Sequence, residues 1–178
     1  MSSALPEVKL RRIGEHDFEL MERWMRLPDV HAFMDFEQPP SGYDLKVELL
    51  AGHVDVLIIT SPDETPVGFF FLYTRGLKGT NVRELDLAVP DVERRRQNIA
   101  KAAIVAFERW AFEEQELTGV WANIFPDNQA CLALLRSCAW PLSETDVGGI
   151  NFRGAPCDVV YTKMTPELLI EARARRGF

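Results

Sequence analysis

The chain has 178 residues, 47% hydrophobic and 26% charged, which predicts one globular domain whose core needs no disulfide or metal. This composition excludes collagen-like, coiled-coil and disordered chains, and the longest apolar runs are far shorter than the ~20 residues that span a bilayer. The net charge of −7 argues against nucleic-acid binding, because that binding depends on neutralising phosphates. It suits a cationic or amine-bearing ligand, although solubility is the simpler explanation.

The cysteines and histidines suggest no redox or metal chemistry. Cys131, Cys138 and Cys157 show no CxxC spacing, and the N-terminus lacks the pattern of a secretory signal, so we expect a reduced, cytoplasmic location. Cys131 and Cys138 lie seven residues apart, and we expect them on one helix face in the core. The three histidines lie in separate segments without ligand spacing, so we expect no metal site.

The first third of the chain combines a short strand with helices. Residues 8–13 are expected to form the strand, and the apolar residues of 15–26 recur at helical spacing. Pro28 interrupts this pattern, and short helices are predicted over 29–36 and 43–51.

The middle of the chain has β-rich apolar runs bounded by turn sequences, and the last of these segments alternates with a period of two, as strands do. Strands are predicted over 54–60, 67–75 and 82–89, with turns at 61–64 and 76–79. In the third of these strands Glu84 and Asp86 share one face with Val82 and Ala88, and Pro90 ends it. Two carboxylates therefore project from the same face.

The remainder alternates between helices and strands. The predicted elements are a helix over 96–115, a strand over 118–124, a helix over 128–137, a strand ending with 161–164 and a helix over 167–176. Gly148, Gly149 and Gly154 indicate a loop before the last strand. This order predicts an α/β domain over residues 1–178, with one mixed sheet covered by helices.

Three consecutive arginines, Arg94, Arg95 and Arg96, precede the helix predicted over 96–115. The first N–H groups of a helix have no internal partner and carry the positive end of its dipole. Together with adjacent arginines, they form a site suited to a pyrophosphate. The alternative is that these arginines only form a solvated face.

These residues resemble the GNAT N-acyltransferase superfamily. Residues 95–100, RRQNIA, are similar to its R/Q-x-x-G-x-G/A signature, and residues 120–128, VWANIFPDN, resemble its fifth strand and the Asn that opens the next helix. The spacing from Asn128 to Ala139-Trp140 resembles its Asn…Gly-Phe pattern. The resemblance covers about residues 8–164, leaves 165–178 as a C-terminal helix, and is strongest to the RimJ/RimL-like branch, which acetylates protein N-termini and some small amines. It implies a central mixed sheet of six to seven strands flanked by helices.

The resemblance assigns roles to specific residues. Glu84 would be the general base that deprotonates the amine. Asp86 stands where the family commonly has glycine, so its role comes from the residues themselves: two neighbouring carboxylates raise one another's pKa and attract a cation, and we expect Asp86 to assist Glu84 as a second catalytic carboxylate. The alternative is that the two acids are solvated charges on an exposed strand face. Acetyl-CoA, the implied co-substrate, would contact Leu87, Ala88, Val89, Arg95, Arg96, Gln97, Asn98, Ile99, Ala100, Lys101 and Asn128. The Val89 N–H would polarise the thioester carbonyl. Asn128 is also a favoured helix cap, and the two roles are compatible.

Other residues besides Asp86 also depart from the family pattern. Asn98 replaces a glycine, although Asn tolerates a positive φ better than most residues. Ala139-Trp140 replaces Gly-Phe. Leu135 stands where many members have the tyrosine that protonates the departing thiolate, so that general acid is missing.

The acceptor side has weaker signals. Substrate selection would fall to residues 24–36, with 150–158 as a second segment. The first contains an aromatic and acidic cluster that suits an amine ligand and supplies the candidate substrate-binding residues Trp24, His31, Phe33 and Asp35. For each one, packing in a pair of helices is the alternative. We expect an N-acetyltransferase acting on a protein N-terminus or a small-molecule amine. A non-catalytic module that binds acyl-CoA or a partner protein is the alternative that Leu135 and Asn98 favour. Many relatives are dimers, so the resemblance also admits a homodimer.

Overall fold

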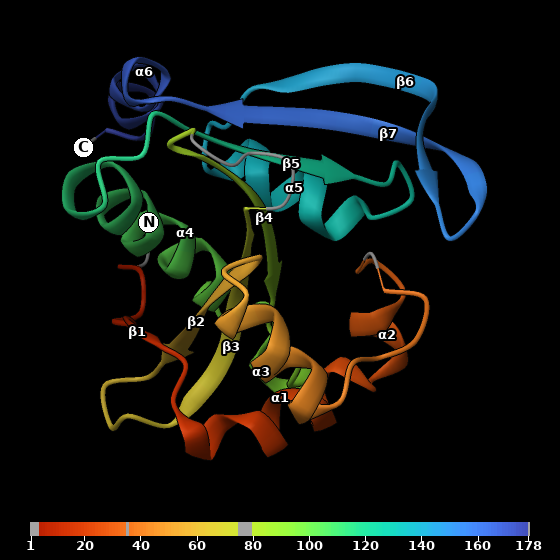
Figure 1. The fold of residues 1–178 in the computed structure, drawn as a ribbon. Coiled ribbons are helices and arrows are strands. Elements are labelled where there is room, and N and C mark those ends of the chain that lie inside the picture. Colours follow the sequence, from red (N-terminus) through yellow and green to blue (C-terminus); the bar gives the residue numbers. More distant parts are fainter. Residues whose placement is uncertain (1–3, 35, 75–79, 178) are drawn as a thin grey trace.

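The computed structural model describes residues 4–34, 36–74 and 80–177. One seven-stranded sheet has the order β1-β2-β3-β4-β5-β7-β6 (Figure 1). Its strands are β1 (Lys9–Arg12), β2 (Val54–Thr60), β3 (Pro66–Tyr73), β4 (Val82–Ala88), β5 (Gly119–Ile124), β6 (Leu142–Phe152) and β7 (Ala155–Met164). Neighbouring strands are antiparallel except β4 and β5, which are parallel. The predicted mixed sheet of six to seven strands flanked by helices is confirmed.

Helices cover both faces of this sheet. They are α1 (Phe18–Met25), α2 (Pro28–His31), α3 (Gly42–Leu50), α4 (Ile99–Arg109), α5 (Gln129–Ser137) and α6 (Pro166–Arg176). Hydrophobic residues of α1, α2 and α3 form one core with one face of β2 and β3, and those of α4, α5 and α6 form a second core on the other face. None of the helices in the described ranges is long and apolar enough to cross a membrane.

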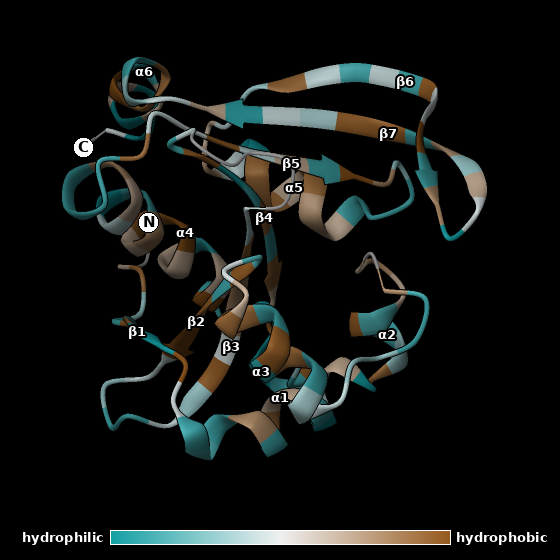
Figure 2. Ribbon diagram, in the orientation of Figure 1, coloured by the Kyte–Doolittle hydropathy of each residue, from teal (hydrophilic) through white to brown (hydrophobic). Residues whose placement is uncertain are grey.

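Strand β3 shows why both faces need covering. Phe69 and Phe71 pack into the core under α1 and α3, whereas Phe70 and Leu72 pack into the core under α4. Alternate residues of a strand point to opposite faces, so an apolar run without alternation is buried on both sides. Figure 2 shows hydrophobic colouring along β2 and β3.

The region after Trp140 differs from the prediction. The loop expected around Gly148 and Gly149 is strand β6, which pairs with β7, and β7 ends at Met164 as predicted. β6 is an edge strand exposed along most of its length and shifts register at Leu142/Thr145 and Asp146/Ile150, so it lacks the apolar alternation from which strands are recognised. Gly154, with φ +82°, lies in the turn of this β6–β7 hairpin.

Two helices also have other bounds than predicted. The helix expected over 29–36 is only α2, which ends at His31. The helix expected over 96–115 begins at Ile99, and its last turn, Trp110–Glu114, is a π-helix. The predicted turn at 76–79 and the predicted end of a strand at Arg75 lie outside the described residues.

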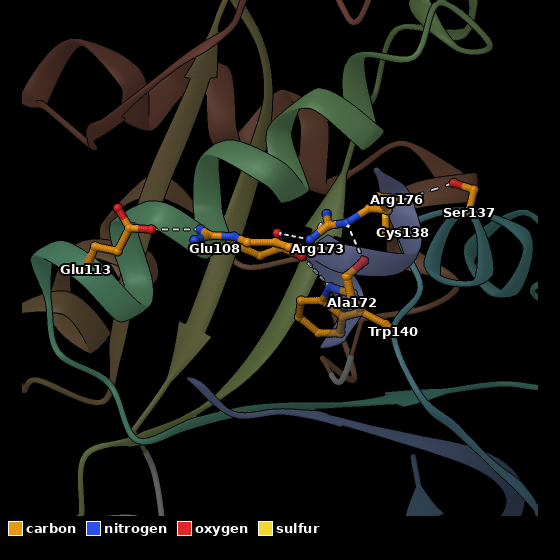
Figure 3. Close-up of polar contacts among 8 residues, drawn as sticks. All are labelled: Glu108, Glu113, Ser137, Cys138, Trp140, Ala172, Arg173 and Arg176. Atoms are coloured by element: carbon orange, nitrogen blue, oxygen red, sulfur yellow. Dashed lines mark hydrogen bonds and ion pairs between the residues drawn. The ribbon is translucent and has the colours of Figure 1, made fainter. Parts of the chain in front are cut away.

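A buried ionic cluster fixes α6 against α4 (Figure 3). The Trp140 indole N–H donates to Glu108 Oε1 at 2.7 Å, and Arg176 donates to both carboxylate oxygens at 3.2 and 2.8 Å. The side chains of Arg176 and Glu108 are 5% and 1% exposed. The cluster therefore joins α4, α6 and the segment after α5.

Candidate active site

Strands β4 and β5 separate within the sheet. Within the described residues they pair only through Val82, Arg83 and Glu84 of β4, opposite residues 119–121 of β5. From Leu85 to Ala88, β4 pairs with β3 alone among the described strands. We call the space between β4 and β5 beyond the Glu84–Trp121 pair the divergence. In the described part of the chain, the β4–β5 ladder ends at this pair, and backbone groups that a ladder leaves open are the kind that a ligand can bind.

Glu84 and Asp86 lie where the divergence begins. Glu84 belongs to the last pair with β5, and Asp86 follows on the same face of β4. Glu84 Oε1 accepts a hydrogen bond of 3.0 Å from the Asn123 side-chain amide of β5. Asp86 Oδ2 accepts one of 3.0 Å from the Tyr73 hydroxyl of β3. Both carboxylates are half-buried, so the predicted pairing on one face is present and each is held by a neighbouring strand.

Cys131 of α5 lies within electrostatic range of Asp86. Burial, and then the negative charge of Asp86, raise the pKa of the Cys131 thiol to about 12. Cys131 is therefore a protonated thiol at neutral pH. Burial also raises the pKa of Cys138, which directly follows α5, and both cysteines pack against the core under α4 and α5, as expected.

The loop before α4 has the backbone shape that the resemblance implies. Asn98 is the residue before the first helical turn and is left-handed, with φ +59° and ψ +13°, and Arg96 has φ +64°. Both side chains are exposed. Asn98 therefore occupies a conformation that glycine adopts at no steric cost, and its side chain caps no helical N–H. The helix start lies beyond the carboxyl end of β4, beside the divergence.

Arg95 serves a different purpose from Arg96. Its Nε donates to the Val89 carbonyl at 2.9 Å and its Nη2 to the Pro90 carbonyl at 3.2 Å. It also forms an ion pair with Asp29 of α2. Arg95 therefore braces the end of β4, whereas Arg96 presents its charge to solvent. The sequence carries no signal for this division.

Asn128 is a helix cap. Its Oδ1 accepts a hydrogen bond of 3.1 Å from the backbone N–H of Cys131. Leu135, at the position of the family tyrosine, is 5% exposed and part of the core.

The candidate acceptor residues are placed apart. Trp24 stacks on Phe69, with ring centroids 5.9 Å apart, and packs against the core under α1. Phe33 is 37% exposed and lies 6.3 Å from the Phe125 ring. His31 Nε2 lies 3.0 Å from the Phe36 carbonyl. Asp35 lies outside the described residues.

The tip of the β6–β7 hairpin joins this group, and it lies within residues 150–158, the second segment that the sequence offered for substrate selection. Phe152 packs edge-on against Phe125 at 4.6 Å, and Arg153 donates to the carbonyls of His31 and Met34. Because β6 was not predicted, no signal placed its tip against α2. The hairpin tip and the residues after α2 therefore meet over the end of β5.

A surface hollow of about 720 Å³ lies between the N-terminal segment, α4 and α6, away from the divergence, and does not locate the site. No group of three or more His, Cys, Asp or Glu side chains within the described ranges is placed to hold a metal ion. The divergence is therefore the candidate active site on strand geometry alone.

Comparison with known families agrees with this geometry. Residues 14–145 match the family model of the acetyltransferase (GNAT) domain. The chain belongs to the GNAT acetyltransferase family. The predicted enzyme class and the use of acetyl-CoA as co-substrate are confirmed for this acetyltransferase at the level of the family. No curated protein matches its sequence significantly.

Solved structures share the fold of this acetyltransferase at low identity. A spermidine N-acetyltransferase from Vibrio cholerae, in complex with CoA and spermine, has a TM-score of 0.77 at 12% identity, covering 92% of this chain and 98% of its own. Mycobacterium smegmatis RimJ, in complex with CoA-disulfide, has a TM-score of 0.74 at 18% identity, and the match covers 96% of this chain and 89% of that one. The aminoglycoside acetyltransferase AAC(6')-Ib, in complex with coenzyme A and kanamycin, has a TM-score of 0.75 at 16% identity, and the match covers 94% of this chain and 99% of that one. These similarities establish the fold.

Proposed function

We propose that this acetyltransferase moves an acetyl group from acetyl-CoA to a primary amine, on a protein N-terminus or a small molecule, by direct attack. The observation that carries the proposal is the pair Glu84 and Asp86 on one face of β4, where β4 leaves β5. The RimJ/RimL-like sequence features support a protein N-terminus or small amine as acceptor, and structural neighbours solved with spermine or kanamycin support an amine.

Acetyl-CoA would bind along the divergence. The free N–H groups at the start of α4 and the charges of Arg96 and Lys101 would hold the pyrophosphate. The backbone of residues 87–89 would bind the pantetheine arm, and the Val89 N–H would polarise the thioester carbonyl. Arg95 would contribute by bracing Val89 and Pro90, as its two hydrogen bonds to their carbonyls suggest.

Glu84 would act as the general base. An ammonium cannot attack, so a carboxylate must take a proton from the amine, directly or through water. The nitrogen then bonds to the carbonyl carbon, and the carbon–sulfur bond breaks as the intermediate collapses. Leu135 has no proton to give and is buried, so CoA would leave as the thiolate. Asp86 would attract the cationic acceptor and assist the proton transfer.

The test combines calorimetry with a thiol-release assay on a panel of amines. We expect acetyl-CoA binding in the wild type, and a loss of kcat of about 10²–10⁴-fold in Glu84→Gln with acetyl-CoA affinity unchanged. Glu144→Gln, an exposed β6 carboxylate, is the matched control. An unchanged rate in Glu84→Gln would remove Glu84 from the mechanism, and a larger loss in Asp86→Asn would transfer the base role to Asp86.

A non-catalytic acyl-CoA-binding module is the second candidate, and the buried Leu135 favours it. It predicts acetyl-CoA binding with no thiol release for any amine. The same assay therefore separates the two functions.

A further inference from the structure

We propose that Asn123 of β5 is a positioning residue for Glu84. The inference rests on the proposed function, in which Glu84 is the base. Asn123 lies two residues beyond Trp121, the last β5 residue paired with β4. Backbone pairing has ended there, and the 3.0 Å hydrogen bond from Asn123 Nδ2 to Glu84 Oε1 links the separating strands.

The orientation of the Asn123 carboxamide follows from its partner. An ionised carboxylate only accepts hydrogen bonds, so it requires the amide nitrogen, not the oxygen, to face it. This contact occupies Oε1 and fixes the plane of the Glu84 carboxylate. A hydrogen bond to the charged form also favours that form, so Asn123 keeps Glu84 ready to take a proton.

The other end of the Asn123 carboxamide contributes nothing to the fold. Its Oδ1 is buried and meets no hydrogen-bond donor within residues 4–34, 36–74 and 80–177. A buried acceptor without a donor destabilises a folded protein. An apolar side chain of similar size would avoid this cost, so the Asn123 amide is explained by its contact with Glu84 and not by stability.

This reasoning separates activity from stability. Asn123→Leu keeps the number and branching of the side-chain heavy atoms, while the donor to Glu84 and the buried Oδ1 are both removed. We expect kcat to fall about tenfold, as for loss of a hydrogen bond to a charged group, with a smaller change in the KM for the amine. The acid limb of the pH–rate profile should move to higher pH, and the urea midpoint should stay the same or rise. A purely structural role predicts a fall in the midpoint without a change in the pH profile.

Asn123→Asp provides a second variant of the same shape. It places a second carboxylate beside Glu84, which raises the apparent pKa of the pair and should move the acid limb further than Asn123→Leu does. Gln115→Ala, an exposed carboxamide after the π-helix, is the control and should match the wild type.

The double variant Glu84→Gln/Asn123→Leu tests whether Asn123 affects kcat through Glu84. If Asn123 acts through Glu84, the second substitution should add little to the first. An unchanged rate in Glu84→Gln would refute the proposed base. A strong loss in Glu84→Gln with wild-type rate and pH profile in Asn123→Leu would refute only the positioning role, and so would independent, multiplicative losses in the double variant.

Discussion

Arg95, in the loop before α4, is joined to Asp29 of α2 by an ion pair, although 66 positions separate them in the chain. Arg95 also donates to the carbonyls of Val89 and Pro90. The end of β4, which borders the divergence, is therefore connected through one guanidinium to the helix that leads to His31 and Phe33.

Substitutions of Arg95 and of Asp29 should have unequal effects on acetyl-CoA affinity. Arg95→Ala removes the ion pair and both carbonyl contacts, so we expect acetyl-CoA affinity to fall about tenfold. Asp29→Asn removes only a half-exposed ion pair, worth about 0–1 kcal/mol, and should change affinity less than threefold. Calorimetry on both variants and on the double variant gives the coupling. Equal losses from the two single variants would contradict the bracing role of the carbonyl contacts.

Replacing Ala139 with glycine should increase the stability of the protein. It adopts φ +55°, a left-handed conformation that costs a residue with a Cβ about 1–2 kcal/mol. Because glycine also gains freedom in the unfolded chain, we expect Ala139→Gly to stabilise the protein by about 0.5–1 kcal/mol. Urea unfolding measures this change. Asn98→Gly, at φ +59°, is the comparison and should have a smaller effect, since Asn tolerates this region. A larger gain at Asn98 would contradict the reasoning.

The buried cluster around Glu108 should be sensitive to the loss of one charge. Arg176→Met leaves a buried carboxylate without its cation, so we expect a loss of about 3 kcal/mol in the free energy of unfolding. Arg175→Met is the matched control on the same helix, because the Arg175–Glu171 pair is exposed and worth at most about 0.5 kcal/mol. Similar urea midpoints for the two variants would show that α6 is not held by this cluster.

Asp17 should make stability depend on pH in the acidic range. Burial disfavours its charged form, but hydrogen bonds from Arg11 at 2.6 and 2.8 Å and from the Gly14 N–H lower its pKa below the ordinary 3.8. A lowered pKa stabilises the fold above the unfolded value, and this contribution disappears as the pH falls from 3.8 through the folded value.

Asp17→Asn tests this contribution. It should lower the free energy of unfolding by about 3 kcal/mol at pH 7 and reduce its slope below pH 4. Asp55→Asn, which disrupts the exposed Arg12–Asp55 pair, is the control. Urea midpoints between pH 2 and 7 that fall equally in the wild type and in Asp17→Asn would refute the assignment.

The sequence predicted most elements because their apolar residues recur with the right period. The alternation in residues 82–89 placed Glu84 and Asp86 on one face, and the structure agrees. Their hydrogen-bond partners could not be found in this way. Asn123 lies 39 residues from Glu84, and Tyr73 lies 13 from Asp86, so only the pairing of strands brings them together.

The hairpin shows the opposite limit of sequence patterns. A strand exposed on both faces has no stripe of buried apolar residues, so the sequence of β6 shows no alternation of apolar and polar residues. Because β6 was not predicted as a strand, its contacts with other elements could not be predicted either. Arg153 meets His31 across 122 positions of the chain. Contacts of this kind depend on the three-dimensional path of an element that periodicity does not reveal.

The short pairing of β4 with β5 has a mechanical consequence. Four antiparallel strands lie on one side of it and three on the other, and among the described residues three backbone pairs connect these two parts of the sheet. We therefore expect the sheet to bend most easily between β4 and β5. A molecule bound in the divergence would contact both parts of the sheet and restrain this bending. Amide hydrogens of β4 and β5 should then exchange more slowly when the divergence is occupied, whereas those of β2 and β3, which pair with a strand on each side, should change little.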